Sequence, residues 1–104
     1  MLEVDQSAQF ALSEDILLKA FPEISQYYAF DTRNGDHFNL NVTAHWVLDR
    51  IANGDSFRLL MESFATEFDL KKEDAFKDLA ELLEFALENK IITKRFNYEE
   101  KESV

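Results

Sequence analysis

The segment that most constrains the fold runs from residue 36 to residue 54, where a short strand leads directly into a helix. Residues 38–40 have the pattern of a strand, and Asn41 follows as an N-cap whose side-chain oxygen can accept from an unpaired backbone amide. Asn53 and Gly54 then end the helix. Between these limits apolar residues recur at helical spacing: Ala44, Val47, Leu48 and Ile51. A strand joined without a linker to a capped helix, with two more amphipathic helices behind it, predicts a small winged-helix-like domain.

Length and composition limit the chain to one domain with a modest core. It has 104 residues, of which 46% are hydrophobic, including ten Phe, and this is enough for a packed interior. The absence of cysteine excludes disulfides, thiolate catalysis and Cys-ligated metals. Residues 1–5 have neither the basic start nor the apolar stretch of a signal peptide, and no apolar run is long enough to span a membrane. We therefore expect a cytoplasmic protein with no membrane partner.

The charge of the chain narrows the kind of partner. The formal net charge is −10 at pH 7. Affinity for nucleic acid depends mainly on Lys and Arg, which release counterions from the phosphates, so a chain this acidic is expected to repel a phosphate backbone. The composition favours a protein or peptide partner and no nucleic acid.

The chain divides into a lead-in, a central domain and a tail. Residues 1–14 lack clear periodicity and are expected to form a loose or partner-dependent lead-in, and residues 94–104 are expected to form a charged tail. Residues 15–93 form the domain. It begins with a strand candidate at Asp15–Phe21, which Pro22 ends because proline cannot donate to a sheet ladder.

A hairpin follows, for which two registers are open. Its two strands are expected at Tyr27–Thr32 and Asp36–Leu40. A two-residue Asn-Gly loop would pair Phe30 with Asn39. A three-residue loop, with Gly35 in a left-handed conformation, would pair Phe30 with Phe38 and gather the large apolar groups on one face. We favour the three-residue loop, because burial of one face fixes register strongly.

The second helix begins after Asp55 and Ser56 and carries one apolar stripe typical of a helix that faces a core. The stripe consists of Phe57, Leu60, Met61, Phe64 and Phe68. The third helix is expected from about Lys72 to Glu88, and its end is followed by residues 91–93, which are extended or close the core. Together these elements predict an α+β fold, with a short three-stranded antiparallel sheet packed on three helices.

The third helix carries apolar residues over an unusually wide arc. One stripe consists of Phe76, Leu79, Ala80, Leu83 and Leu87. The other consists of Ala75, Leu82, Ala86 and, further round, Phe85. At 100° per residue the two stripes cover about 220°, wider than the ~100° that packing on one side needs.

The sequence offers no catalytic or cofactor site. No serine stands in a nucleophile-elbow context, and the two glycines do not form a phosphate-binding loop. His37 and His45 lie on different elements without supporting cysteine or close carboxylate spacing, so we expect no metal and no cofactor. His37 is a candidate surface contact, and Trp46 is either a packing residue or a binding anchor.

Several residues of the strand–helix segment match a known pattern: Phe38, Leu40, Asn41, Thr43, Ala44, Leu48, Ile51 and Gly54. The match continues through the apolar positions of the next two helices and Asn89-Lys90-Ile91-Ile92. With these residues the chain resembles the PqqD family, named for pyrroloquinoline quinone biosynthesis protein D. The resemblance covers roughly residues 15–93. The family fold is shared by the precursor-peptide recognition elements of pathways that make ribosomally synthesised, post-translationally modified peptides (RiPPs).

The resemblance implies a function without catalysis. In that family the leader segment of a precursor peptide adds as a further strand beside the third strand, in a cleft against the third helix. The peptide is then presented to a separate modifying enzyme, such as a radical-SAM maturase. Carried over to this chain, the implied peptide-binding residues are Asp36, His37, Phe38, Asn39 and Leu40 on the strand and Lys72, Phe76, Leu79, Ala80 and Leu83 on the helix. The peptide, the pathway and the oligomeric state stay open.

A rival reading is a winged-helix regulator that binds DNA, or a structural subunit of a larger complex. A DNA reader should expose Lys and Arg on its reading helix. Here the second and third helices carry mostly acidic residues, with one basic cluster formed by Arg58, Lys71, Lys72 and Lys77. The carboxylates at positions 81, 84 and 88 indicate either a solvated face or a selector for a basic leader peptide. Peptide recognition is the favoured function.

Overall fold

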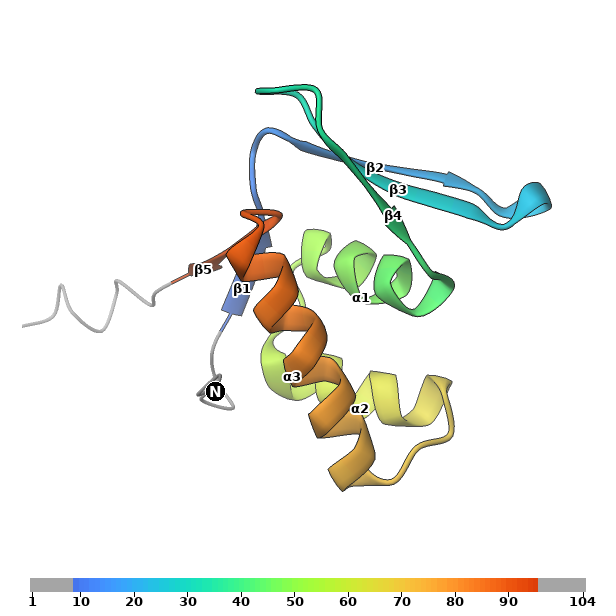
Figure 1. Ribbon diagram of the computed structural model, residues 1–104. Coiled ribbons are helices and arrows are strands. Elements are labelled where there is room, and N and C mark those ends of the chain that lie inside the picture. Colours follow the sequence, from blue (N-terminus) through green and yellow to red (C-terminus); the bar gives the residue numbers. More distant parts are fainter. Residues whose placement is uncertain (1–8, 96–104) are drawn as a thin grey trace, which may run out of the picture.

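A computed structural model describes residues 9–95 and shows an α+β fold with a three-stranded sheet above three helices (Figure 1). The strands are β2 (Ile16–Phe21), β3 (Gln26–Asp31) and β4 (His37–Leu40), in the order β2-β3-β4 with antiparallel neighbours. A single 3₁₀ turn, η1 (Pro22–Ile24), connects β2 to β3. The structure confirms the predicted fold class and places β4 at one edge of the sheet.

Three helices lie on one side of this sheet: α1 (Val42–Ala52), α2 (Phe57–Glu67) and α3 (Lys72–Glu88). Helix α1 begins as predicted, because the side chain of Asn41 accepts a hydrogen bond from the amide of Ala44 at 2.7 Å. The hydroxyl of Ser56 accepts from the amide of Leu59 at 3.2 Å and caps α2 in the same way. These bonds satisfy amides that the first turn of a helix leaves unpaired, and so they fix where each helix begins.

The core lies between the sheet and the helices. The stripe predicted on α2 is confirmed: Phe57, Leu60 and Phe64 are buried, and Met61 and Phe68 pack against them at partly buried positions. On α3 the buried residues come from both predicted stripes: Ala75, Leu79, Leu83 and Ala86. The wide apolar arc of α3 is therefore only partly used by the core, and large side chains remain on its surface.

A second sheet, which the sequence does not predict, joins the two ends of the described chain. Strand β1 (Gln9–Leu12) pairs antiparallel with β5 (Ile92–Arg95). The apolar residues of this region, Phe10, Ile91 and Ile92, are buried. The extended segment expected after the third helix is thus confirmed, and the expected lead-in contains a strand. Residues 1–8 and 96–104, which hold the rest of the predicted lead-in and most of the predicted tail, lie outside the described residues.

The hairpin register differs from both of the expected ones. Phe30 pairs with His37, and Ala29 pairs with Phe38. Because successive side chains of a strand point to opposite faces, Ala29 and Phe38 share the core face, while Tyr28 and Phe30 lie on the outer face. The prediction that Phe30 pairs with Phe38 is wrong, because the middle strand places the small, fully buried Ala29 against the core.

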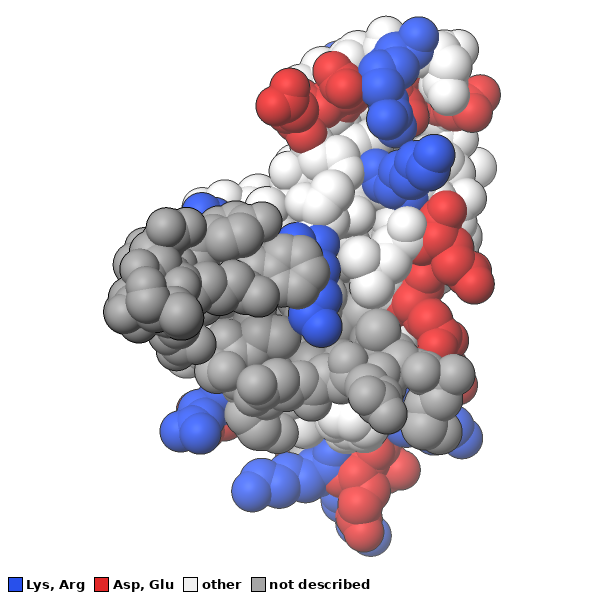
Figure 2. Space-filling view, turned by 90° about the vertical axis from the view of Figure 1, so that its left-hand side faces the viewer, with Lys and Arg blue, Asp and Glu red and all other residues white. Residues whose placement is uncertain are grey.

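Asp31 organises the loop that sets this register. Its carbonyl accepts from the amide of Gly35 at 2.9 Å, and its amide donates to the carbonyl of Asp36 at 2.8 Å. Asp31 is only 3% exposed, and its carboxylate accepts from the guanidinium of Arg33 at 2.7 and 3.0 Å. Gly35 has φ +80°, the left-handed conformation predicted for it. These bonds close a loop one residue longer than the favoured turn, and charged side chains of both signs surround it at the top of Figure 2.

Candidate functional site

Strand β4 has one open edge, because it pairs with β3 on one side only. In an antiparallel ladder, hydrogen-bonded pairs alternate with non-bonded pairs. The bond from the Asp31 amide to the Asp36 carbonyl fixes this alternation. Counting along β4 from that bond, His37 and Asn39 direct their amides and carbonyls to the open edge. Both residues are exposed, so the edge presents a row of free backbone groups on which a further strand can pair.

Helix α3 presents one of its faces next to this edge. The ring of Phe85 meets the ring of Phe38 edge to face, with centroids 6.2 Å apart. Phe85 is nevertheless 42% exposed, so its other surface is free for a partner. The face continues at helical spacing toward the start of the helix: Phe85, Leu82, Glu81 and Asp78.

A hollow of about 430 Å³ extends this surface between α3 and the start of α1. Its lining residues are Asn41, Thr43, Ala44, Phe64, Asp78, Glu81 and Leu82. Asn41 directly follows the last residue of β4, so the hollow continues the line of the open edge. Its volume falls within the range of common ligand pockets. The strand edge therefore offers main-chain hydrogen bonds, while the helix face and the hollow offer apolar contact and two carboxylates.

The structure keeps the predicted strand residues together. His37, Phe38, Asn39 and Leu40 form β4, and Asp36 lies in the loop before it. Leu40 belongs to the core, and the side chain of Phe38 is half-buried beside α3. The positions with exposed side chains are thus the two that also expose their backbone groups.

The predicted helix residues lie away from this edge or beneath the surface. Leu79 and Leu83 are fully buried, and Ala80 is half-buried. Phe76 packs on Phe57, with centroids 6.1 Å apart, and Lys72 is the exposed first residue of α3. Figure 1 shows that this start of α3 lies beside α2, at the end of the molecule away from the sheet. From the sequence, Glu81 was a candidate selector for a basic leader peptide, whereas Asp78, Leu82 and Phe85 were not assigned to the peptide site. The second apolar stripe was the available signal for Leu82 and Phe85.

The remaining singled-out side chains have packing partners. His45 stacks on Tyr27 at 5.0 Å, and the ring of Trp46 packs 5.5 Å from Phe68 with the Arg50 guanidinium 5.1 Å above it. Trp46 is therefore a packing residue of the helical layer. Within residues 9–95, no group of three or more His, Cys, Asp or Glu side chains is placed to hold a metal ion. In the same part of the chain, no helix has the length and apolar character needed to cross a membrane.

Fold and site together define a small winged-helix-like domain with an open strand edge beside an apolar helix face. The chain belongs to the PqqD family: the family model described as Coenzyme PQQ synthesis protein D (PqqD) matches residues 26–92. This match runs from the start of β3 to the start of β5.

A solved structure has a similar fold, described as "Lasso peptide synthetase B1 complexed with the leader peptide". It superposes with a TM-score of 0.72 at 26% sequence identity, and the similarity covers 83% of this chain and 99% of that chain. No curated protein sequence matches the chain.

Proposed function

We propose that this chain is a non-catalytic module that binds the leader of a ribosomally made precursor peptide as an added strand on β4 and presents it to a separate modifying enzyme. The observation that carries the proposal is the open β4 edge beside the exposed Phe85 face of α3. Membership of the PqqD family supports it, as does the similar fold of the structure described as lasso peptide synthetase B1 complexed with the leader peptide. The binding module comprises the domain predicted at residues 15–93 and acts in the cytoplasm.

In this geometry, backbone groups of β4 supply affinity for a peptide, and side chains supply selectivity. Main-chain bonds to His37 and Asn39 are available to any extended peptide, whereas side-chain contacts select among peptides. Alternate residues of an added strand, about 6.6 Å apart, point to the same face. An inward-pointing residue of the peptide therefore meets Phe38 and Phe85, and a neighbouring inward residue meets the hollow at Leu82. The two carboxylates beside the hollow favour a peptide with Lys or Arg there.

Replacement of Asn39 by proline tests strand addition directly. Proline removes the outward amide of Asn39, while the bonds between β3 and β4 come from the alternate residues and are kept. We expect Asn39→Pro to weaken binding of the leader peptide encoded with this chain by about tenfold or more, as for an anchor at the centre of an interface. Fluorescence anisotropy with a labelled leader peptide gives the affinity.

Asn39→Ala is the matched control, because it removes the same side chain and keeps the amide. The alanine variant should bind the peptide nearly as well as the original chain. Circular dichroism melts check that both variants fold. Equal affinity of the proline and alanine variants would show that β4 is not the strand to which the peptide adds.

A further inference from the structure

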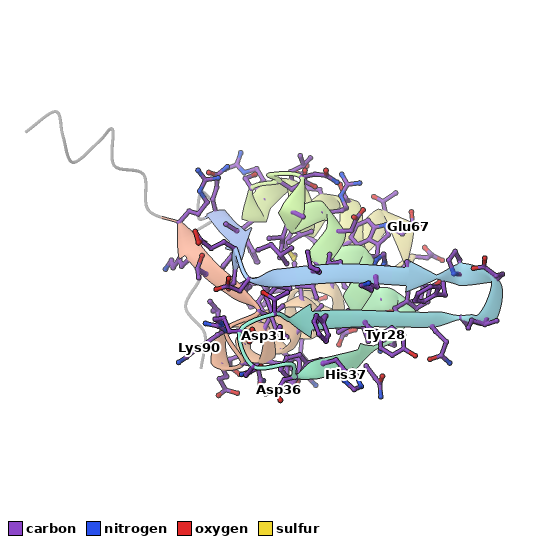
Figure 3. All side chains as sticks on the ribbon, turned by 90° about the horizontal axis from the view of Figure 1, so that it is seen from above. Tyr28, Asp31, Asp36, His37, Glu67 and Lys90 are labelled. Atoms are coloured by element: carbon purple, nitrogen blue, oxygen red, sulfur yellow. The ribbon has the colours of Figure 1, made fainter. Side chains whose placement is uncertain are left out.

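The outer face of the three-stranded sheet carries apolar and aromatic side chains that the helices do not cover. Leu17 is 49% exposed and Phe21 is 44% exposed. Tyr28 bridges the strands, with its ring 6.3 Å from Phe21 on β2 and 6.0 Å from His37 on β4. Figure 3 shows this face from outside, with Tyr28 and His37 on it and the helices behind the sheet. Large exposed apolar patches on a small domain mark interaction surfaces.

The patch is concave and spans all three strands. A hollow of about 430 Å³ lies on it, lined by Leu17, Lys19, Phe21, Tyr28, Phe30 and His37. These residues form cross-strand pairs: Leu17 faces Phe30, Lys19 faces Tyr28, and Phe30 faces His37. A single strand added on β4 would lie beside His37 and Asn39 and would leave the side chains on β2 and β3 uncovered. A partner that fills the hollow must cover the sheet, so it is a folded protein surface.

The charge of the patch differs from that of the whole chain. None of its six lining residues is acidic, although the chain has 21 Asp and Glu and a net charge of −10. Lys19 brings a positive charge to the patch. Because salt screens charges beyond about 8 Å at physiological ionic strength, this local charge dominates a docked interface. The patch therefore fits an apolar protein surface with a carboxylate opposite Lys19.

A second copy of this chain fits the patch poorly. A symmetric contact would set the Lys19 side chains of two copies on facing surfaces, and each copy carries the same net negative charge. Like charges placed across an interface oppose association. A different protein, with a complementary acidic group, meets neither obstacle.

The patch is continuous with the proposed peptide edge. The side chains of His37 and Asn39 point to this outer face, and every second side chain of a strand added beside them would do the same. A protein seated on the outer face would therefore touch the bound peptide along one side. From this position a modifying enzyme could receive the peptide without displacing it from β4.

We infer that the outer face of β2, β3 and β4, centred on Leu17, Lys19 and Tyr28, docks the peptide-modifying enzyme. This inference rests on the proposed function, since the peptide edge defines which protein must come close. The occupant is a folded enzyme that presents an apolar surface and a carboxylate.

The test compares two exposed leucines of similar exposure on opposite sides of the molecule. Leu17→Glu places a carboxylate in the patch, whereas Leu59→Glu places one on α2, where Leu59 is 45% exposed. The probe is the purified modifying enzyme encoded beside this chain, titrated against the chain loaded with its leader peptide. We expect Leu17→Glu to weaken enzyme binding by about tenfold or more and Leu59→Glu to leave it unchanged. Neither variant should change the affinity for the peptide alone.

Two charge-reversal variants distinguish a lost enzyme contact from misfolding. Lys19→Glu reverses the patch charge at an exposed position and should also weaken enzyme binding, while Lys94→Glu on β5 should not. The inference is overturned if the enzyme still binds both Leu17→Glu and Lys19→Glu. It is also overturned if sedimentation shows that the original chain is a dimer and that Leu17→Glu dissociates it. If the original chain binds no leader peptide, the proposed function itself fails, and this result is distinct from peptide binding with an unaffected enzyme contact.

Discussion

At the scale of single residues, Asp31 is the buried charge on which the hairpin loop depends. The Arg33 guanidinium that donates hydrogen bonds to this carboxylate holds the pKa of Asp31 below its usual range. A carboxyl with a lowered pKa in the folded state stabilises the fold above its unfolded pKa, about 3.9, and loses this contribution as the pH falls through the folded pKa. We expect Asp31→Asn to lower the free energy of unfolding at neutral pH. Its difference from the original chain should shrink only below about pH 4.

Urea unfolding at a series of pH values measures this difference. Asp49→Asn serves as the control, because Asp49 is an exposed carboxylate on α1 and its removal changes the net charge equally. A difference for Asp31→Asn that stays constant down to the lowest pH would show that ionisation of Asp31 does not stabilise the hairpin.

Local chemistry decides how well individual residues can be predicted. The N-cap at Asn41 follows from the sequence because a cap acts within three residues, on the amide of Ala44. The hairpin register does not follow, because the Asn-Gly signal competes with a carboxylate that ties Arg33 and Gly35 to Asp31. Burial of large apolar groups predicts neither the buried charge of Asp31 nor the small Ala29 on the core face of β3.

At the scale of elements, α3 carries two exposed phenylalanines, and each belongs to a different candidate surface for the peptide. Phe85 is 42% exposed beside β4, and Phe76 is 40% exposed beside α2. We expect Phe85→Ala to weaken leader-peptide binding by about tenfold, because it removes the apolar side chain of α3 that lies beside the open edge of β4. Phe76→Ala should leave the affinity unchanged. Isothermal titration calorimetry measures both.

The two variants are matched for stability. Each loses one edge-to-face aromatic contact, with a cost of about 1 kcal/mol in the free energy of unfolding. Thermal unfolding of both verifies this match. The opposite ranking of affinities would favour the wall predicted from the sequence, in which Phe76 contacts the peptide.

The positions of the helices in the chain were more predictable than the contacts that each element makes. Apolar periodicity defines α1, α2 and α3, because the core face of each helix is written in its own sequence, and side-chain caps also mark the starts of α1 and α2. Pairing of β1 with β5 joins residues far apart in the chain, and four-residue strands carry too little pattern to show it. The apolar arc of α3 predicts two apolar faces. Only the packed structure shows that Leu79 and Leu83 face the core, that Phe85 meets Phe38 of β4, and that Leu82 lines the hollow at the start of α1.

At the scale of the whole molecule, charge separates this chain from the DNA-binding proteins that share a winged-helix architecture. Helix α3 carries Lys72 and Lys77 as its only basic residues, against six carboxylates: Glu73, Asp74, Asp78, Glu81, Glu84 and Glu88. On the face shown in Figure 2, blue Lys and Arg side chains are interspersed with red Asp and Glu side chains. The net charge of −10 was readable from composition, whereas the acid-free outer patch emerges only when β2, β3 and β4 align their side chains.

This charge distribution predicts the behaviour of the chain toward nucleic acid. Binding to duplex DNA derives mainly from counterions that Lys and Arg displace, and a molecule with excess carboxylates gains little from that release. We expect a dissociation constant on the order of 10⁻⁴ M or weaker at about 0.15 M salt, without sequence preference. Fluorescence anisotropy with random and candidate operator duplexes measures it, and the labelled leader peptide serves as the positive control. Sub-micromolar, sequence-dependent binding of DNA by a chain that ignores the peptide would make a winged-helix regulator the better reading of this fold.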